Sequence, residues 1–74
     1  SGATKAALTI YKDAKIVAIS PASTNPPLTQ SGMYPNFFRT IAPDDAQAKL
    51  DVDFVLNYLK AKKVAIIHDK GDYG

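Results

Sequence analysis

The sequence contains no cysteine and only one histidine, His68. The missing cysteines exclude a disulfide and thiol catalysis, and a single histidine cannot supply the paired ligands of a zinc site. No Gly-x-Ser-x-Gly segment is present, which argues against a hydrolase nucleophile elbow. Two apolar runs, at residues 16–19 and 64–67, are typical of buried strands. The segments that follow them, Ser20-Pro21-Ala22 and His68-Asp69-Lys70, lack the glycines of a phosphate-binding loop. The sequence therefore predicts no catalytic residues, no metal site and no cofactor.

Charge of one sign and long apolar runs are also missing. The formal net charge is +2, and the lysines are scattered apart from the pair Lys62-Lys63. That pair precedes an apolar segment and is typical of a solvated turn rather than of a nucleic-acid patch. No apolar run is long enough to span a membrane. A signal peptide is not visible, although a mature chain or a fragment would have lost one.

The length of 74 residues allows at most one domain. A chain of this size buries only about 60% of its unfolded surface, which makes it marginally stable on its own. Ser1-Gly2 lacks an initiator methionine, and Asp72-Tyr73-Gly74 ends where a further helix is expected. We therefore expect residues 1–74 to be a fragment of a larger protein.

What is present is a pattern of alternating helices and strands. Apolar spacing predicts helices at residues 4–14 and 44–60, the second capped by Asp44 with Gln47 completing a capping box. Strands are expected at residues 16–19, buried on both faces, and at 36–41 and 64–67, with a proline-rich loop at residues 20–35. This order predicts an α/β fold: part of a doubly wound, largely parallel sheet covered by helices.

Polar side chains gather at the predicted carboxyl ends of the strands, where open α/β sheets bind ligands. Ser20, Ser23, Thr24 and Asn25 either bind a ligand or satisfy the backbone of their own turn. The first helix begins close to Ser1, and its free N–H groups either bind an anion or are capped by water. Both alternatives stay open at each place. We expect Arg39 to face outward or to pair with a carboxylate.

The second helix carries an additional apolar stripe made of Leu50, Phe54 and Tyr58. Exposed on an isolated helix, such a stripe is a liability. We expect it to pack against a neighbouring element or a partner chain.

Four sequence blocks together carry a resemblance to a known family. They are Ser1-Gly2-Ala3-Thr4; Ile19-Ser20-Pro21-Ala22-Ser23-Thr24 with Leu28-Thr29; Phe38-Arg39-Thr40 with Pro43-Asp44 and Gln47; and Val64-Ala65-Ile66-Ile67-His68-Asp69 with Tyr73-Gly74. In this order, the chain resembles the type I periplasmic ligand-binding proteins of the branched-chain amino-acid (Leu/Ile/Val)-binding family. The resemblance implies two α/β lobes with the ligand between them, and residues 1–74 as a fragment of the N-terminal lobe.

The resemblance also implies roles for five residues. Ser1 would meet the α-carboxylate of an amino acid, and the Ala22 carbonyl and Thr24 hydroxyl would accept hydrogen bonds from its α-ammonium. Ser23 would supply nearby backbone groups, and Tyr73 would line the cleft. Donors at one end and acceptors at the other suit a zwitterion.

The implied function is that of a periplasmic or cell-surface solute-binding protein, which delivers an amino acid or a similar small polar solute to the membrane permease of an ABC importer. The alternative is a sensor with the same fold, either a receptor domain or an amide-responsive regulator. Dimerisation through Leu50, Phe54 and Tyr58 would favour the sensor. An enzyme of doubly wound fold is the weakest interpretation, because the sequence shows no recognisable set of catalytic residues.

Overall fold

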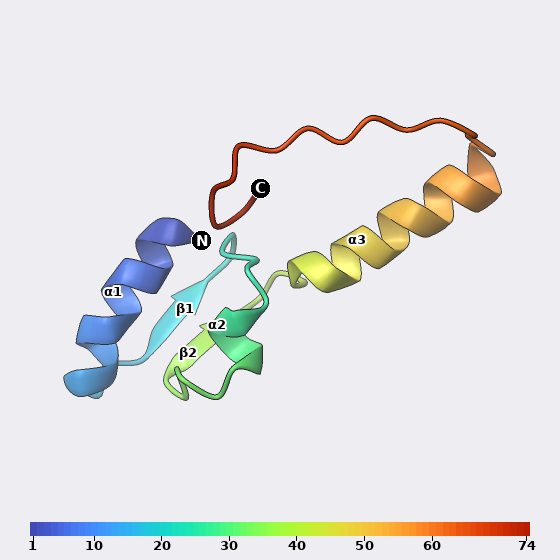
Figure 1. The fold of residues 1–74 in the computed structure, drawn as a ribbon. Coiled ribbons are helices and arrows are strands. Elements are labelled where there is room, and N and C mark those ends of the chain that lie inside the picture. The colour runs from blue at the N-terminus through green and yellow to red at the C-terminus, as the bar shows by residue number, and fades with distance from the viewer.

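Two short parallel strands organise the first half of the chain (Figure 1). The computed structural model describes residues 1–74, with the elements α1 (Gly2–Asp13), β1 (Ala18–Ser20), α2 (Pro27–Gln30), β2 (Phe37–Arg39), α3 (Asp44–Asp53) and the π-helix η1 (Phe54–Tyr58). Strands β1 and β2 pair in parallel, with Ala18 opposite Phe37 and Ser20 opposite Arg39. The parallel pair, with helices before, between and after its strands, confirms the predicted α/β class.

The core lies between α1, α2 and one face of the two-stranded sheet. Leu8 of α1, Leu28 of α2 and Phe37 of β2 are buried against one another. Because successive strand residues point to opposite faces, Ile19 and Phe38 point away from this core. They are 68% and 53% exposed. The prediction that residues 16–19 are buried on both faces is therefore wrong for this chain, whose helices cover only one face.

The segment predicted as one loop, residues 20–35, contains the short helix α2. Pro27 occupies its first turn, where a missing N–H costs nothing because that group has no intrahelical partner. The prolines that predicted a loop therefore start a helix here. The practical result is that Leu28 reaches the core and ties the loop to the sheet.

Helix α3 begins at Asp44, one residue earlier than it would if Asp44 were its N-cap. Pro43 is the N-cap, no side chain caps the helix, and Asp44 already has a helical position. The predicted capping box with Gln47 is therefore wrong. The backbone N–H of Asp44 instead donates to the Thr24 carbonyl at 2.9 Å, so the first turn of α3 is held by the loop after β1.

The predicted helix at residues 44–60 changes character after Asp53. It continues as the π-helix η1, in which the Leu59 N–H donates to the Phe54 carbonyl at 3.0 Å. The rings of Phe54 and Tyr58 stack with centroids 4.9 Å apart. Leu50, Phe54 and Tyr58 are all exposed, so no other element of residues 1–74 covers this stripe.

Residues 64–67 do not form the predicted strand. They run as unpaired extended chain from the far end of η1 back toward the start of α1 (Figure 1), and Ile67 is 95% exposed. A β-strand needs a neighbouring strand for its backbone hydrogen bonds, and this path does not follow either edge of the β1–β2 pair. Every helix falls short of the length and apolarity that a membrane crossing demands.

Candidate functional site

A hollow of about 660 Å³ lies at the carboxyl ends of both strands. Its wall combines the loop after β1, the segment after β2, the first turns of α3 and the end of the chain. The lining residues are Pro21, Ala22, Thr24, Ile41, Ala42, Ala46, Gln47, Leu50 and Tyr73. The structure thus brings together three predicted site residues, Ala22, Thr24 and Tyr73. Ser1 and Ser23 do not line this hollow.

The turn that leaves β1 satisfies most of its own polar groups. The hydroxyl of Ser20 accepts hydrogen bonds from the N–H groups of Ala22 (3.2 Å) and Ser23 (3.0 Å) and donates to the Ser23 hydroxyl (3.0 Å). The Ser23 hydroxyl also bonds that of Thr4, on the first turn of α1. For Ser20 and Ser23, the turn-forming alternative describes what the side chains do in this structure.

Thr24 differs from its neighbours. Its side chain is only 7% exposed, and its hydroxyl oxygen is buried without a hydrogen-bond partner. Leaving a buried hydroxyl unpaired costs about 1–3 kcal/mol. The carbonyl of Ala22, two residues earlier on the same wall, also accepts no hydrogen bond within the chain. Two acceptors on this wall therefore have no hydrogen-bond partner within the chain.

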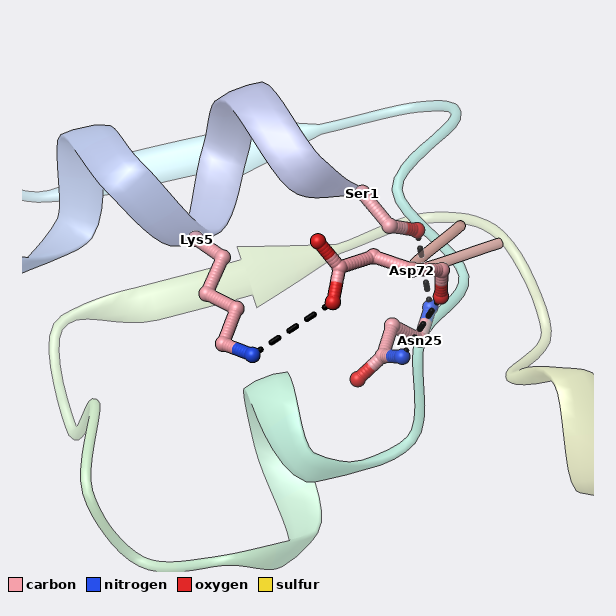
Figure 2. A network of polar contacts seen from close by, with 4 residues as sticks. All are labelled: Ser1, Lys5, Asn25 and Asp72. Atoms are coloured by element: carbon pink, nitrogen blue, oxygen red, sulfur yellow. Dashed lines mark hydrogen bonds and ion pairs between the residues drawn. The ribbon is translucent and has the colours of Figure 1, made fainter. Parts of the chain in front are cut away.

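Ser1 anchors the same turn from the other side, at the start of α1. Its hydroxyl accepts a hydrogen bond from the backbone N–H of Asn25 at 3.1 Å and does not cap α1. The Asn25 amide donates to the Asp72 carbonyl at 2.7 Å, and the Asp72 carboxylate pairs with Lys5 at 3.4 Å (Figure 2). This network holds the chain end, including the 63% exposed Tyr73, beside the turn.

One of the two expectations for Arg39 was that it pairs with a carboxylate, and the structure shows no such pair. Its Nη1 donates to the carbonyls of Ser23 (3.2 Å) and Asn25 (2.9 Å), and its Nη2 donates to the Pro26 carbonyl (3.5 Å) and the Thr29 hydroxyl. The sequence reasoning missed this contact. The available signal was Pro26-Pro27, because two residues without N–H groups leave a turn with more acceptors than donors.

The lining of the hollow is mostly apolar, and its polar side chains are those of Thr24, Gln47 and Tyr73. The one histidine lies in the exposed chain end, where its Nδ1 accepts the N–H of Lys70 at 3.2 Å. The neighbouring Asp69 carboxylate accepts the N–H of Gly71 at 2.7 Å. Each side chain thus bonds its own turn rather than the other. Open acceptors at Ala22 and Thr24 suit a ligand group that carries N–H or O–H donors.

Comparison with known proteins supports the same interpretation. The profile of the family described as "Receptor family ligand binding region" matches residues 1–74. The chain is 47% identical to the "Amino acid binding protein" of Pseudomonas aeruginosa and 43% identical to the "Leucine-specific-binding protein" of Salmonella typhimurium. It is 40% identical to the "Leu/Ile/Val-binding protein homolog 1" of Brucella abortus.

Each of these matches covers the whole chain but only 20% of the relative. The chain thus spans about a fifth of the length of these relatives. No solved structure matches the chain.

Proposed function

Since the chain belongs to the family described as the receptor family ligand binding region, we propose that it is part of a solute-binding protein for amino acids. The ligand is an L-amino acid of the branched-chain type, held between two lobes. Residues 1–74 supply one wall of that cleft as a piece of the N-terminal lobe. The names of the relatives describe amino-acid binding rather than catalysis, which supports a protein that binds its ligand unchanged.

The unpartnered hydroxyl of Thr24 carries this proposal. An α-ammonium has three N–H donors, and it pairs with the Thr24 hydroxyl and the Ala22 carbonyl on the wall of the hollow. A charged donor makes a stronger hydrogen bond than a neutral one. Binding of the ammonium therefore offsets the cost of burying the hydroxyl without a partner.

The start of α1 provides for the other end of the zwitterion. Ser1 uses its hydroxyl oxygen as an acceptor for Asn25, so its O–H proton is free to donate to a carboxylate. The Asp72 carboxylate already lies here, with Oδ2 3.1 Å from where a Cβ on Gly2 would stand. A carboxylate at this helix end is favoured by the free N–H groups of the first turn. Ser23, whose hydroxyl bonds Thr4, keeps the turn against α1.

The bare apolar surfaces support the assignment to a larger lobe. Ile19 and Phe38 on the open sheet face and Ile66 and Ile67 in the extended segment are exposed. Parallel sheets are normally covered on both faces. In the complete protein, residues 64–67 join the sheet as a strand, and helices from the rest of the lobe cover the open face.

The complete protein acts as the periplasmic or cell-surface component of an ABC importer. Ligand binding closes the two lobes, and the closed form docks on the membrane permease. The exposed Leu50, Phe54 and Tyr58 favour a second candidate, a receptor domain or an amide-responsive regulator that dimerises through this stripe. Light scattering separates the two: a monomer with and without ligand supports the importer, and a dimer lost in Tyr58→Lys supports the sensor.

A ligand screen on the complete protein tests the proposed function. After removal of bound ligand by unfolding and refolding, the twenty amino acids are added singly in a thermal-shift assay, followed by calorimetry of those that raise the melting temperature. We expect leucine, isoleucine or valine to bind with one site per chain. Residues 1–74 alone should bind amino acids weakly or not at all, because they supply only one wall of the cleft. A protein that binds no amino acid contradicts the proposal.

A further inference from the structure

Arg39 holds the turn that carries the open acceptors, although it does not line the hollow itself. We infer that Arg39 is a positioning residue for ligand binding: its guanidinium fixes the peptide groups around Thr24 and so aims the Thr24 hydroxyl and the Ala22 carbonyl at the ligand before it arrives. This role rests on the proposed function.

The strand register places Arg39 where this contact is possible. Arg39 stands directly opposite Ser20, the last residue of β1, and the Thr40 N–H donates to the Ser20 carbonyl at 3.2 Å. The turn leaves β1 at this same point. The pairing of β1 with β2 therefore places the guanidinium at the base of the turn.

Arg39 supplies the donor that one carbonyl of the turn otherwise lacks. The carbonyls of Ser23, Asn25 and Pro26 converge on its guanidinium. Asn25 and Pro26 also accept backbone N–H groups from the start of α2, whereas the Ser23 carbonyl has no other donor. A guanidinium carries its donors in a rigid, planar fork, so one side chain can satisfy several carbonyls. A lysine ammonium at this place is a single point donor and cannot span the same set.

The bonds from Arg39 bracket Thr24. One Nη1 atom bonds the carbonyls of the residues on either side of it, Ser23 and Asn25. The Thr24 carbonyl is held by the N–H of Asp44. With the peptide groups on both sides fixed, the backbone of Thr24 and the direction of its side chain are set. Holding a binding group in its bound geometry raises affinity, because less order has to be created on binding.

A double-mutant cycle on the complete protein tests this role, with L-leucine as the probe in calorimetry. Arg39→Met and Thr24→Val are each expected to weaken binding by about tenfold or more, since 1.4 kcal/mol corresponds to a factor of ten. If Arg39 acts through Thr24, the Kd of the double variant for L-leucine should lie within about threefold of the Kd of the single variant that binds less tightly. Independent roles would instead multiply the two fold-losses in affinity. Lys12→Met, which removes an exposed positive charge from α1, leaves the affinity unchanged.

Arg39→Lys keeps the cycle informative if Arg39→Met fails to fold, and we expect it to recover only part of the affinity. Fold-losses that multiply in the double variant, or full wild-type affinity in Arg39→Lys, overturn the positioning role. In either case, leucine binding by the wild-type protein still supports the proposed function. A wild-type protein that binds neither leucine nor any other amino acid overturns both together.

Discussion

All five buried residues of the chain lie between Leu8 and Phe37, whereas none of the residues from Asp44 to Gly74 is buried. The first region packs two helices on a strand pair and ties its loops together with side-chain hydrogen bonds. The second region is a helix, a π-turn and an extended segment that returns to α1 (Figure 1).

The two regions are nevertheless both apolar. The second contains Leu50, Val52, Phe54, Leu56, Leu59, Val64, Ile66 and Ile67, all exposed. Hydrophobic composition alone therefore does not make a core. In the first region the apolar side chains of three elements meet on one sheet face. In the second they lie along a helix and an extended segment that pairs with no strand. The candidate site lies at the border, with its wall built by the first region and completed by α3 and Tyr73.

The largest expected effect comes from the core of the first region. In the complete protein, Phe37→Ala should lower the free energy of unfolding by about 3–5 kcal/mol, because it leaves a cavity between Leu8 and Leu28. Urea unfolding followed by circular dichroism measures the change. A loss below about 1 kcal/mol would mean that this cluster is not the core.

Ile67→Ala tests the second region with the same measurement. In the 74-residue chain the change should stay within about 0.5 kcal/mol, because the side chain is already in water. In the complete protein we expect about 2–4 kcal/mol, because residues 64–67 are proposed to join the sheet there. Equal and small effects in both settings would leave the extended segment without a strand partner.

Two adjacent hydroxyls at the border allow a matched comparison. Thr24→Val removes a buried hydroxyl without a partner, so the stability of the ligand-free protein should not fall, while leucine affinity should drop by about 1–3 kcal/mol. Ser23→Ala removes a hydroxyl bonded to Ser20 and Thr4, so it should cost about 1 kcal/mol of stability. Calorimetry and urea unfolding on both variants separate the two roles. Unchanged leucine affinity in Thr24→Val removes Thr24 from the site.

Backbone strain provides a smaller contrast. Lys15 and Lys70 both have positive φ values, 56° and 60°. Lys15 joins α1 to β1, so Lys15→Gly should stabilise the protein by about 0.5–1 kcal/mol by relieving a conformation that side chains resist. Lys70→Gly lies in the exposed chain end, which can open separately, so global unfolding should not change. Thermal and urea unfolding of both variants measure the two changes in stability. A larger gain from Lys70→Gly than from Lys15→Gly would contradict this contrast.

The smallest effect is expected for the ion pair that joins the two regions. The Lys5–Asp72 pair is 3.4 Å long, with side chains 59% and 42% exposed. A double-mutant cycle with Lys5→Met and Asp72→Asn should give a coupling energy of less than about 1 kcal/mol that disappears in high salt. The Asn25 contact should survive Asp72→Asn, because it uses the backbone carbonyl. A larger, salt-insensitive coupling would show a far tighter junction.

Several elements could be predicted because their signals are local. The apolar spacing around Leu8 predicts α1, the β-branched run before Ser20 predicts β1, and the pattern from Asp44 onward predicts α3. The predictions failed where a distant group competes with the local one. Asp44 does not cap α3 because Pro43 takes the N-cap position and Asp44 already lies in the first turn, where the Thr24 carbonyl accepts its N–H. Arg39 donates to carbonyls of a turn rather than to a carboxylate.

The candidate site divides in the same way. The polar, proline-rich turn after β1 was predicted as a place for a ligand. Of the five residues that the resemblance singled out, the structure brings Ala22, Thr24 and Tyr73 to one hollow, and Ser1 and Ser23 lie outside its lining. Which hydroxyl stays open was not predictable from composition. Ser20, Ser23 and Thr24 are near neighbours with the same chemistry, and only their contacts with α1 and with one another separate them.

By itself, the sequence determined the α/β class, the family and the location of the polar turn after β1, because spacing and residue type act over a few neighbouring residues. Only the tertiary structure decided that Arg39 braces this turn, that Ser1 and Ser23 anchor it and that Thr24 keeps a free acceptor. These outcomes depend on which groups from distant segments come within hydrogen-bond range. The parallel register of β1 and β2 brings Arg39 to the turn, and the position of α1 brings Ser1 and Thr4 to it.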